Sequence, residues 1–105
     1  MINLHHMELS DQHPALGIDH GEARIGLAIT DPLGILAHPL ETIHTSQTVP
    51  NIRINELIKL RSIKKIIIGL PLRMDGSEGT AALKIRDFAE ELEKSLPSPI
   101  PIEFI

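Results

Sequence analysis

Apolar positions in the first half of the chain fall into three short stretches with the spacing of strands. Residues 15–19 are apolar until the acid at 19, and residues 24–31 alternate loosely between apolar and polar. A third stretch covers residues 35–43, where Pro39 indicates an edge strand or a bulge. Residues 20–23 contain a glycine and have the length of a hairpin connection. These features predict an antiparallel meander of three strands.

The second half of the chain alternates between helical and strand patterns. Residues 51–61 follow a proline and carry apolar side chains at helical spacing, so a helix is expected. Residues 65–71 are largely β-branched and unbroken, which predicts a strand buried on both faces, as in a parallel sheet. The polar loop 75–79 follows, with Ser77 as the candidate cap of a second helix. That helix carries an apolar stripe formed by Ile85, Phe88, Ala89, Leu92 and Leu96.

The predicted order of elements is β-β-β-α-β-α-β, ending in a strand at residues 100–105. A meander followed by crossover helices indicates an α/β fold, a mixed sheet with helices packed on its faces. Residues 1–13 show neither period and are expected to form an irregular leader, whereas residues 14–105 are expected to form one domain. The chain ends on what should be an interior strand, so an uncovered edge and self-association are predicted.

Composition narrows the class of protein. The 105 residues include two Phe but no Trp, Tyr or Cys, so the core is aliphatic and no disulfide or thiolate site is available. The lack of cysteine fits a reducing cytoplasm. No Lys or Arg precedes Arg24 and no apolar run approaches the ~20 residues of a membrane span, so no signal peptide and no membrane partner are expected. The net charge of −4 argues against broad binding to nucleic acid but permits a local basic rim.

Asp19 is the first candidate for chemistry, because it ends an apolar strand where a side chain leaves the core. A carboxylate there is a suitable ligand for Mg²⁺ or Mn²⁺. Two such ions can activate a water and stabilise the leaving oxygen of a phosphodiester. Gly21 would let a phosphate or a second strand approach the backbone closely. The alternative for Asp19 is an aspartate that begins a turn and bonds its own backbone.

Arg24 opens the second predicted strand five residues after Asp19. Its guanidinium is suited to a bidentate contact with a phosphate. A surface ion pair with Glu22 or Asp31 is an equally good interpretation. The segment Thr30-Asp31-Pro32 is expected to be a capped turn rather than a site.

Arg73 and the loop 75–79 follow the carboxyl end of the predicted parallel strand, where open α/β sheets bind ligands. A helix beginning near Ser77 would direct its positive end toward this region and favour an anion such as phosphate. A glycine-rich connection with a good cap explains the same residues. The sequence leaves both interpretations open.

Five blocks with compatible spacing stand out: GIDHG at 17–21, RIGLA at 24–28, TDP at 30–32, PLETI at 39–43 and IIGLPLRMDGSEG at 67–79. Taken in order, they resemble the pre-16S rRNA nucleases, also called Holliday-junction-resolvase-like proteins. The resemblance implies an RNase H-like fold and cleavage of structured nucleic acid that depends on a divalent metal, Mg²⁺ or Mn²⁺. Its implied substrate is the 5′ end of pre-16S rRNA, or branched DNA.

The resemblance also implies roles for particular residues. Asp19 matches the first-strand catalytic acid and metal ligand of the family, and Arg24 matches an arginine near the phosphate path. The block 69–79, which contains Arg73 and Ser77, matches a loop that borders the active-site cleft. His20 stands where the family more often has an apolar residue.

The family continues beyond the final strand with an acidic stretch and helices, which supply its second acid and a further aspartate. No such segment is present here, so this chain is expected to be an incomplete or shortened member without a complete active site. A module that binds nucleic acid or the ribosome without cleaving is the alternative. A fragment of a sugar-kinase-like or actin-like ATPase is a third interpretation, since those proteins also begin with an Asp-x-Gly strand and hairpin, but they need a second domain.

Overall fold

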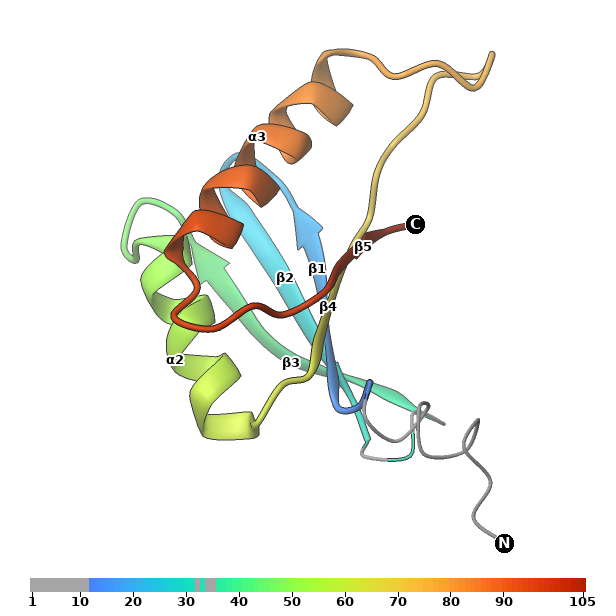
Figure 1. Ribbon diagram of the computed structural model, residues 1–105. Helices are drawn as coiled ribbons and strands as arrows, with labels where there is room; N and C mark the ends of the chain where they lie inside the picture. Colours follow the sequence, from blue (N-terminus) through green and yellow to red (C-terminus); the bar gives the residue numbers. More distant parts are fainter. Residues whose placement is uncertain (1–11, 32, 34–35) are drawn as a thin grey trace, which may run out of the picture.

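The computed structural model describes residues 12–31, 33 and 36–105 (Figure 1). Most of the predicted leader, residues 1–11, and position 35 of the third predicted strand lie outside the described residues. The elements follow the predicted order: β1 (Ala15–His20), β2 (Arg24–Thr30), β3 (Ala37–His44), α2 (Pro50–Arg61), β4 (Lys65–Ile68), α3 (Thr80–Ser95) and β5 (Ile102–Phe104).

The five strands form one mixed sheet in the order β3-β2-β1-β4-β5. The pairs β1–β2 and β2–β3 are antiparallel, whereas β1–β4 and β4–β5 are parallel. The predicted meander and parallel crossovers are therefore confirmed, and the topology agrees with an RNase H-like fold. Pro39 lies on the edge strand β3, opposite a register shift between Leu27 and Ala28, so both of its predicted consequences are found.

The two faces of the sheet differ. Leu16 and Ile18 of β1 are buried, whereas the alternating Gly17 and Asp19 are not. Both helices lie on the side of the buried residues, which we call the helix face (Figure 1). We call the other side, which no helix of the described part covers, the open face. Side chains on the helix face of the sheet pack against α2 and α3 and form an aliphatic core. The largest fully buried side chains of this core are Leu16, Ile25, Ile54, Ile66, Ile68 and Leu92.

The one-sided sheet corrects two predictions. Within the described residues β4 is buried on one face only, because Ile66 and Ile68 face the helices while Ile67 stays partly exposed. The unbroken apolar sequence of β4 suggested a strand covered on both faces of the sheet, but the described helices cover only one of these faces. The last strand, β5, lies at the edge of the sheet rather than in its interior. Neither described helix has the length and hydropathy needed to cross a bilayer.

The start of α3 corrects the predicted cap. The helix begins at Thr80 after Gly79, and no side chain caps it. Ser77 does not act as the cap because its backbone N–H and its hydroxyl both donate to Asp75 Oδ1, at 2.9 and 2.6 Å. Leu96, expected at the end of the apolar stripe, is the C-cap that follows the last helical residue, Ser95.

Candidate active site on the open face of the sheet

Asp19 is the penultimate residue of β1, and its side chain belongs to the open face. Side chains alternate along a strand, so Asp19 faces away from Ile18, which is only 3% exposed, and from His20. The His20 ring packs on Phe88 of α3, with the ring centroids 4.6 Å apart, and burial lowers the pKa of His20. Within the described residues the Asp19 carboxylate makes no hydrogen bond or ion pair, so the turn-forming alternative is not what the structure shows.

Asp19 has a glycine on each side, one on β2 and one directly after β4. Asp19 pairs with Gly26 of β2, and the β1–β4 register places Gly69 next to it on the other side. Gly69 N–H donates to Ile18 O at 3.1 Å. A Cβ at Gly69 would meet nothing within 4 Å, and one at Gly26 would come no closer than 3.8 Å to Asp19 Cβ. Packing within the described residues therefore requires neither glycine, and their bare backbone leaves the carboxylate accessible.

A hollow of about 410 Å³ lies on the open face and includes Asp19. Small residues of β1 and β2 form its floor, and apolar side chains of β4 and the chain beyond β5 border it; these residues include Gly17, Gly26, Ala28, Ile67 and Ile105. The small residues of β2 were not among the predicted site residues. Their signal was the alternation of Gly26 and Ala28 with the buried Ile25 and Leu27.

Arg24 is the nearest basic residue to Asp19 on this face by register. Because Asp19 pairs with Gly26, Arg24 is its diagonal neighbour, at a typical separation of roughly 7–8 Å. The predicted ion pair with Glu22 is not formed, since Glu22 pairs with Lys84 of α3, and this contact lowers the pKa of Glu22. Arg24 is exposed and has no ion pair among the described residues.

Gly21 forms the tight turn between β1 and β2. Its N–H donates to Arg24 O at 2.9 Å, and a Cβ at Gly21 would lie only 2.7 Å from that oxygen. The second strand, one of the two partners predicted for Gly21, approaches this backbone closely. The glycine thereby sets the position of Arg24 relative to Asp19.

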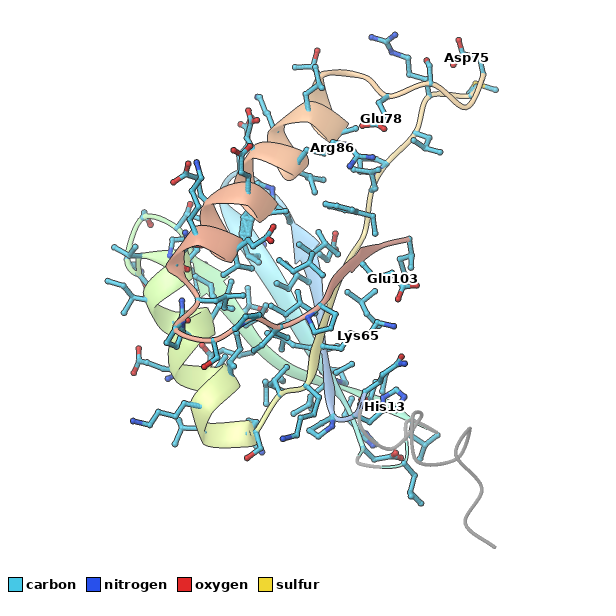
Figure 2. All side chains as sticks on the ribbon, viewed as in Figure 1. His13, Lys65, Asp75, Glu78, Arg86 and Glu103 are labelled. Atoms are coloured by element: carbon cyan, nitrogen blue, oxygen red, sulfur yellow. The ribbon has the colours of Figure 1, made fainter. Side chains whose placement is uncertain are left out.

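Arg73 and Ser77 lie on the loop between β4 and α3, outside the hollow. The loop projects from the end of β4 beyond the N-terminus of α3 (Figures 1 and 2). Arg73 N–H donates to Ser77 O at 2.8 Å, and the Arg73 side chain lies so close to Gly79 that a Cβ there would be 2.9 Å from Nε. The structure thus brings Asp19 and Arg24 together but keeps Arg73 and Ser77 on a separate surface.

At the far end of the open face from Asp19, the lysine of β4 is already paired. Lys65, at the start of β4, forms an ion pair with Glu103 of β5 (Figure 2). Its amine also contacts Gln12 Oε1 at 3.2 Å. Lys65 therefore does not extend a basic surface toward Asp19.

The described residues do not make a complete metal site. Asp19 supplies one accessible carboxylate, which fits one ligand of a hard cation. No group of three His, Cys, Asp or Glu side chains with metal-binding geometry occurs among the residues that the structure describes. A catalytic pair of ions does not fit this single donor.

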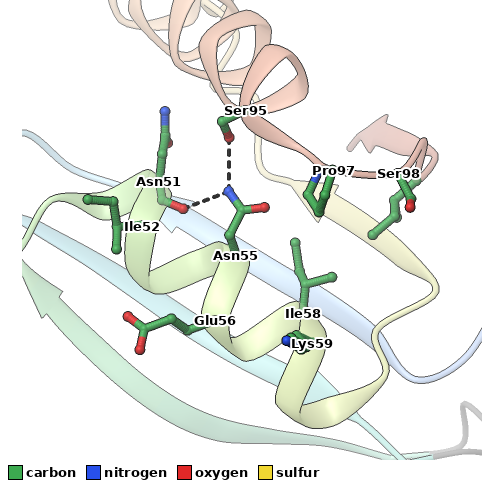
Figure 3. A pocket seen from close by; sticks show the side chains of 10 residues that line it. Asn51, Ile52, Asn55, Glu56, Ile58, Lys59, Ser95, Pro97 and Ser98 are labelled. Atoms are coloured by element: carbon green, nitrogen blue, oxygen red, sulfur yellow. Dashed lines mark hydrogen bonds between the residues drawn. The ribbon is translucent and has the colours of Figure 1, made fainter.

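A larger cavity, of about 700 Å³, lies away from all of these residues, between α2 and the segment after α3 (Figure 3). Its lining is mainly apolar. The Asn55 amide holds its edge, donating to Asn51 O at 2.8 Å and to Ser95 Oγ at 3.0 Å. None of the predicted site residues lines it.

Comparison with known proteins identifies the family of this chain. The profile of the family described as "RuvX: Holliday junction resolvase" matches residues 13–105. Curated proteins with the name "Putative pre-16S rRNA nuclease" are similar. The one from Sulfurihydrogenibium sp. is 46% identical over 90 residues, covering 86% of this chain and 61% of that protein. Those from Acetivibrio thermocellus and Streptomyces avermitilis are 43% and 40% identical, covering 77% and 86% of this chain and 59% and 58% of theirs. The chain thus spans about three fifths of the length of these relatives.

Solved structures support the fold. A "putative sugar kinase" from Cytophaga hutchinsonii superposes with a TM-score of 0.50 at 16% identity, covering 86% of this chain and 35% of that one. Archaeoglobus fulgidus Pelota superposes with a TM-score of 0.53 at 13% identity, covering 94% of this chain and 28% of that one. At such identities the likeness concerns the fold alone.

Proposed function

The chain belongs to the RuvX family of Holliday junction resolvases, and from that premise we propose that it supplies the first acid of a nuclease acting on structured nucleic acid. The substrate we propose is the 5′ end of pre-16S rRNA, with branched DNA as the second candidate. The names of the relatives support a nuclease role. The observation that carries the proposal is the Asp19 carboxylate, accessible between two glycines on the open face.

The side chains suit contact with a phosphodiester. The Asp19 carboxylate is a hydrogen-bond acceptor that can orient a water toward a scissile phosphate. Arg24, its diagonal neighbour, can bind a non-bridging phosphate oxygen through two N–H groups. Gly21 keeps the turn short enough to hold these two residues in register. Arg73 would contact the phosphate backbone farther along, while Ser77 serves by bracing the loop, because its hydroxyl already donates to Asp75.

A divalent cation, Mg²⁺ or Mn²⁺, is part of the proposal as a ligand of Asp19. Such an ion supplies Lewis-acid stabilisation of phosphoryl oxygens when bound. With one carboxylate the expected affinity is weak, in the millimolar range typical of the weakest oxygen-ligand sites. An NMR titration with Mg²⁺ should shift the Asp19 amide and its neighbours in this chain, and Asp19→Asn should remove the shifts. Unchanged shifts in Asp19→Asn would place the ion elsewhere.

Cleavage assays test the nuclease role. The chain is incubated with pre-16S rRNA fragments and a four-way DNA junction in the presence of Mg²⁺ or Mn²⁺, with the full-length Sulfurihydrogenibium relative as the positive control. Asp19→Asn should abolish any cleavage by this chain. Asp87→Asn, an exposed aspartate of α3, is the matched control and should retain it. Cleavage that survives Asp19→Asn would remove the catalytic assignment.

The single carboxylate favours one alternative, a binding module that holds nucleic acid or the ribosome without cleaving it. In that case the positive control cleaves, whereas this chain only binds. Its affinity should then fall steeply with salt, as phosphate contacts require. Turnover by this chain alone would exclude the alternative.

Two further proposals concern the state of the protein. We propose self-association through the outer edge of β5, because no strand of the described part pairs with it. Light scattering should give a mass that rises with concentration, and a monomer at every concentration would contradict this.

We also propose a cytoplasmic location, supported by the nuclease names of the relatives and the lack of cysteine. Fractionation of cells that produce the protein would test it.

A further inference from the structure

The outer end of the loop between β4 and α3 is a tightly built turn. Gly76 N–H donates to Arg73 O, and Arg73 N–H donates to Ser77 O, both at 2.8 Å. Gly76 has a φ of 86°, the left-handed conformation that follows a type I turn in a three-residue hairpin loop. Asp75 Oδ1 accepts from the hydroxyl and the N–H of Ser77, and these bonds lower the pKa of Asp75. Hydrogen bonds on both sides of the tip therefore fix its shape.

Met74 occupies a central position of this turn and is wholly exposed. Its relative exposure is 108%, above that of every other exposed large apolar residue in the described part of the chain. All residues from 71 to 78 are exposed, so burial does not hold the turn in place. A single exposed apolar side chain is ordinary on a protein surface. Met74, however, stands at the tip of a turn that hydrogen bonds hold in shape, so its position is fixed and its side chain is accessible.

The loop starts beside Asp19. At its base Gly69 N–H donates to Ile18 O at 3.1 Å, and Leu70 N–H donates to Ile105 O at 2.8 Å. From there the loop runs outward past the start of α3, with its tip away from the sheet (Figures 1 and 2). A small ligand in the hollow would not reach the tip. A long polymer bound across Asp19 would extend beyond this end of the sheet and meet it.

We propose that Met74 is an apolar wedge that contacts unstacked bases at a branch or bulge of the bound nucleic acid, with Arg73 on the adjacent phosphate. The inference rests on the proposed function and adds the recognition of branched structure to it. Methionine is among the side chains that insert between base steps, and its unbranched, polarisable thioether adapts to different bases. The tip presents the Arg73 guanidinium next to Met74, while the Asp75 carboxylate of the same turn is engaged by Ser77. Because the base of this loop adjoins the strand that carries Asp19, the partner we infer is the nucleic acid of the proposed function.

The test uses 2-aminopurine placed at the branch point of a four-way DNA junction and in the bulge of an RNA helix. EDTA is present, so that binding is measured without cleavage. The wild-type chain should increase the 2-aminopurine fluorescence as it binds. Met74→Ala should remove the increase and weaken binding about tenfold, the loss expected for one base-stacking contact. Met74→Leu, which keeps an apolar side chain, should retain most of both signals.

Controls separate the wedge from a general surface effect. Leu60→Ala, which truncates a 72% exposed leucine of α2, should bind as the wild type does. Met74→Ala should leave binding to a fully paired linear duplex unchanged; an equal loss on the duplex would overturn the wedge. Junction binding unaffected by Met74→Ala would also overturn it and would point to a protein partner for the tip. If the wild-type chain bound none of these nucleic acids, the proposed function would fail together with the inference.

Discussion

Individual glycines of this chain do different work, although their sequence context looks similar. Gly21 is required by its own surroundings, because Arg24 O lies 2.7 Å from the position of a Cβ. Gly69 has open space there and Gly26 has only Asp19 Cβ at 3.8 Å, so neither is required by packing. The lack of a side chain at these two positions instead keeps the Asp19 carboxylate accessible. The block pattern in the sequence did not distinguish these roles.

Substitution by alanine should separate the two roles. Gly21→Ala should lower the free energy of unfolding by about 1–3 kcal/mol, the usual effect of overpacking, because a backbone oxygen must move. Gly69→Ala is the matched control and should change it by no more than about 0.5 kcal/mol. Urea denaturation followed by circular dichroism measures both. Equal losses would show that Gly69 is also required for packing.

At the scale of elements, α3 is attached to the sheet by apolar and polar contacts. Leu92 is fully buried on the helix face, and the ring of Phe88 packs on His20 of β1. Arg86 lies over the Phe104 ring of β5, 4.8 Å from its centroid, and pairs with Glu78. These contacts position α3 against the sheet and thereby fix where the loop that carries Arg73 joins the helix.

The apolar stripe of α3 should provide most of this attachment. Leu92→Ala should destabilise the protein by about 2–5 kcal/mol, as expected for a fully buried leucine that leaves a cavity. Leu83→Ala changes a 58% exposed leucine of the same helix and should have an effect within about 0.5 kcal/mol. Chemical denaturation compares the two. A small effect of Leu92→Ala would mean that the stripe does not anchor the helix.

The link between β3 and α2 should depend on pH. Arg53 donates to both carboxylate oxygens of Glu41, at 2.8 and 2.7 Å, and these hydrogen bonds lower the pKa of Glu41 from its usual 4.5. A lowered pKa stabilises the fold above pH 4.5, and this contribution disappears as the pH falls through the lowered value. Glu41→Gln should therefore melt at a slightly lower temperature than the wild type at pH 7.

The difference between wild type and Glu41→Gln should shrink toward zero in acid. Differential scanning calorimetry across the acidic range measures it. Glu93→Gln, an exposed residue of α3 without an ion pair in the described part of the chain, should give no such pH-dependent difference. A Glu41→Gln difference that persisted below the lowered pKa would have another cause.

At the scale of the whole molecule, the described structure is a sheet covered on one side. Its topology is shared with sugar-kinase and Pelota structures at very low identity, so topology alone does not assign an activity. The family match and the residues of the open face are what direct the assignment to nucleic acid. The chain spans about three fifths of its curated relatives, so the activity of the whole protein stays a proposal.

Residues 14–105 should unfold as one unit. One hydrophobic core joins β3 and its neighbouring strands to both helices. Domains of this size usually unfold in a single two-state transition. Helical circular dichroism and sheet amide signals in NMR should therefore lose intensity at the same urea concentration. Separate transitions for the meander and for the α2–β5 half would contradict a single domain.

The sequence by itself determined the order of elements, the antiparallel meander, the marking of β3 by Pro39 as an edge strand or a bulge, and the candidacy of Asp19. Each of these depends on local periodicity, on proline, or on a strand end, which a linear chain displays directly. Only the tertiary structure decided which side of β4 the helices cover, that Glu22 pairs with Lys84, and that Ser77 braces a turn instead of capping α3. These outcomes depend on contacts between residues far apart in the chain, or on competition between nearby hydrogen-bond partners. Sequence spacing does not encode either of them.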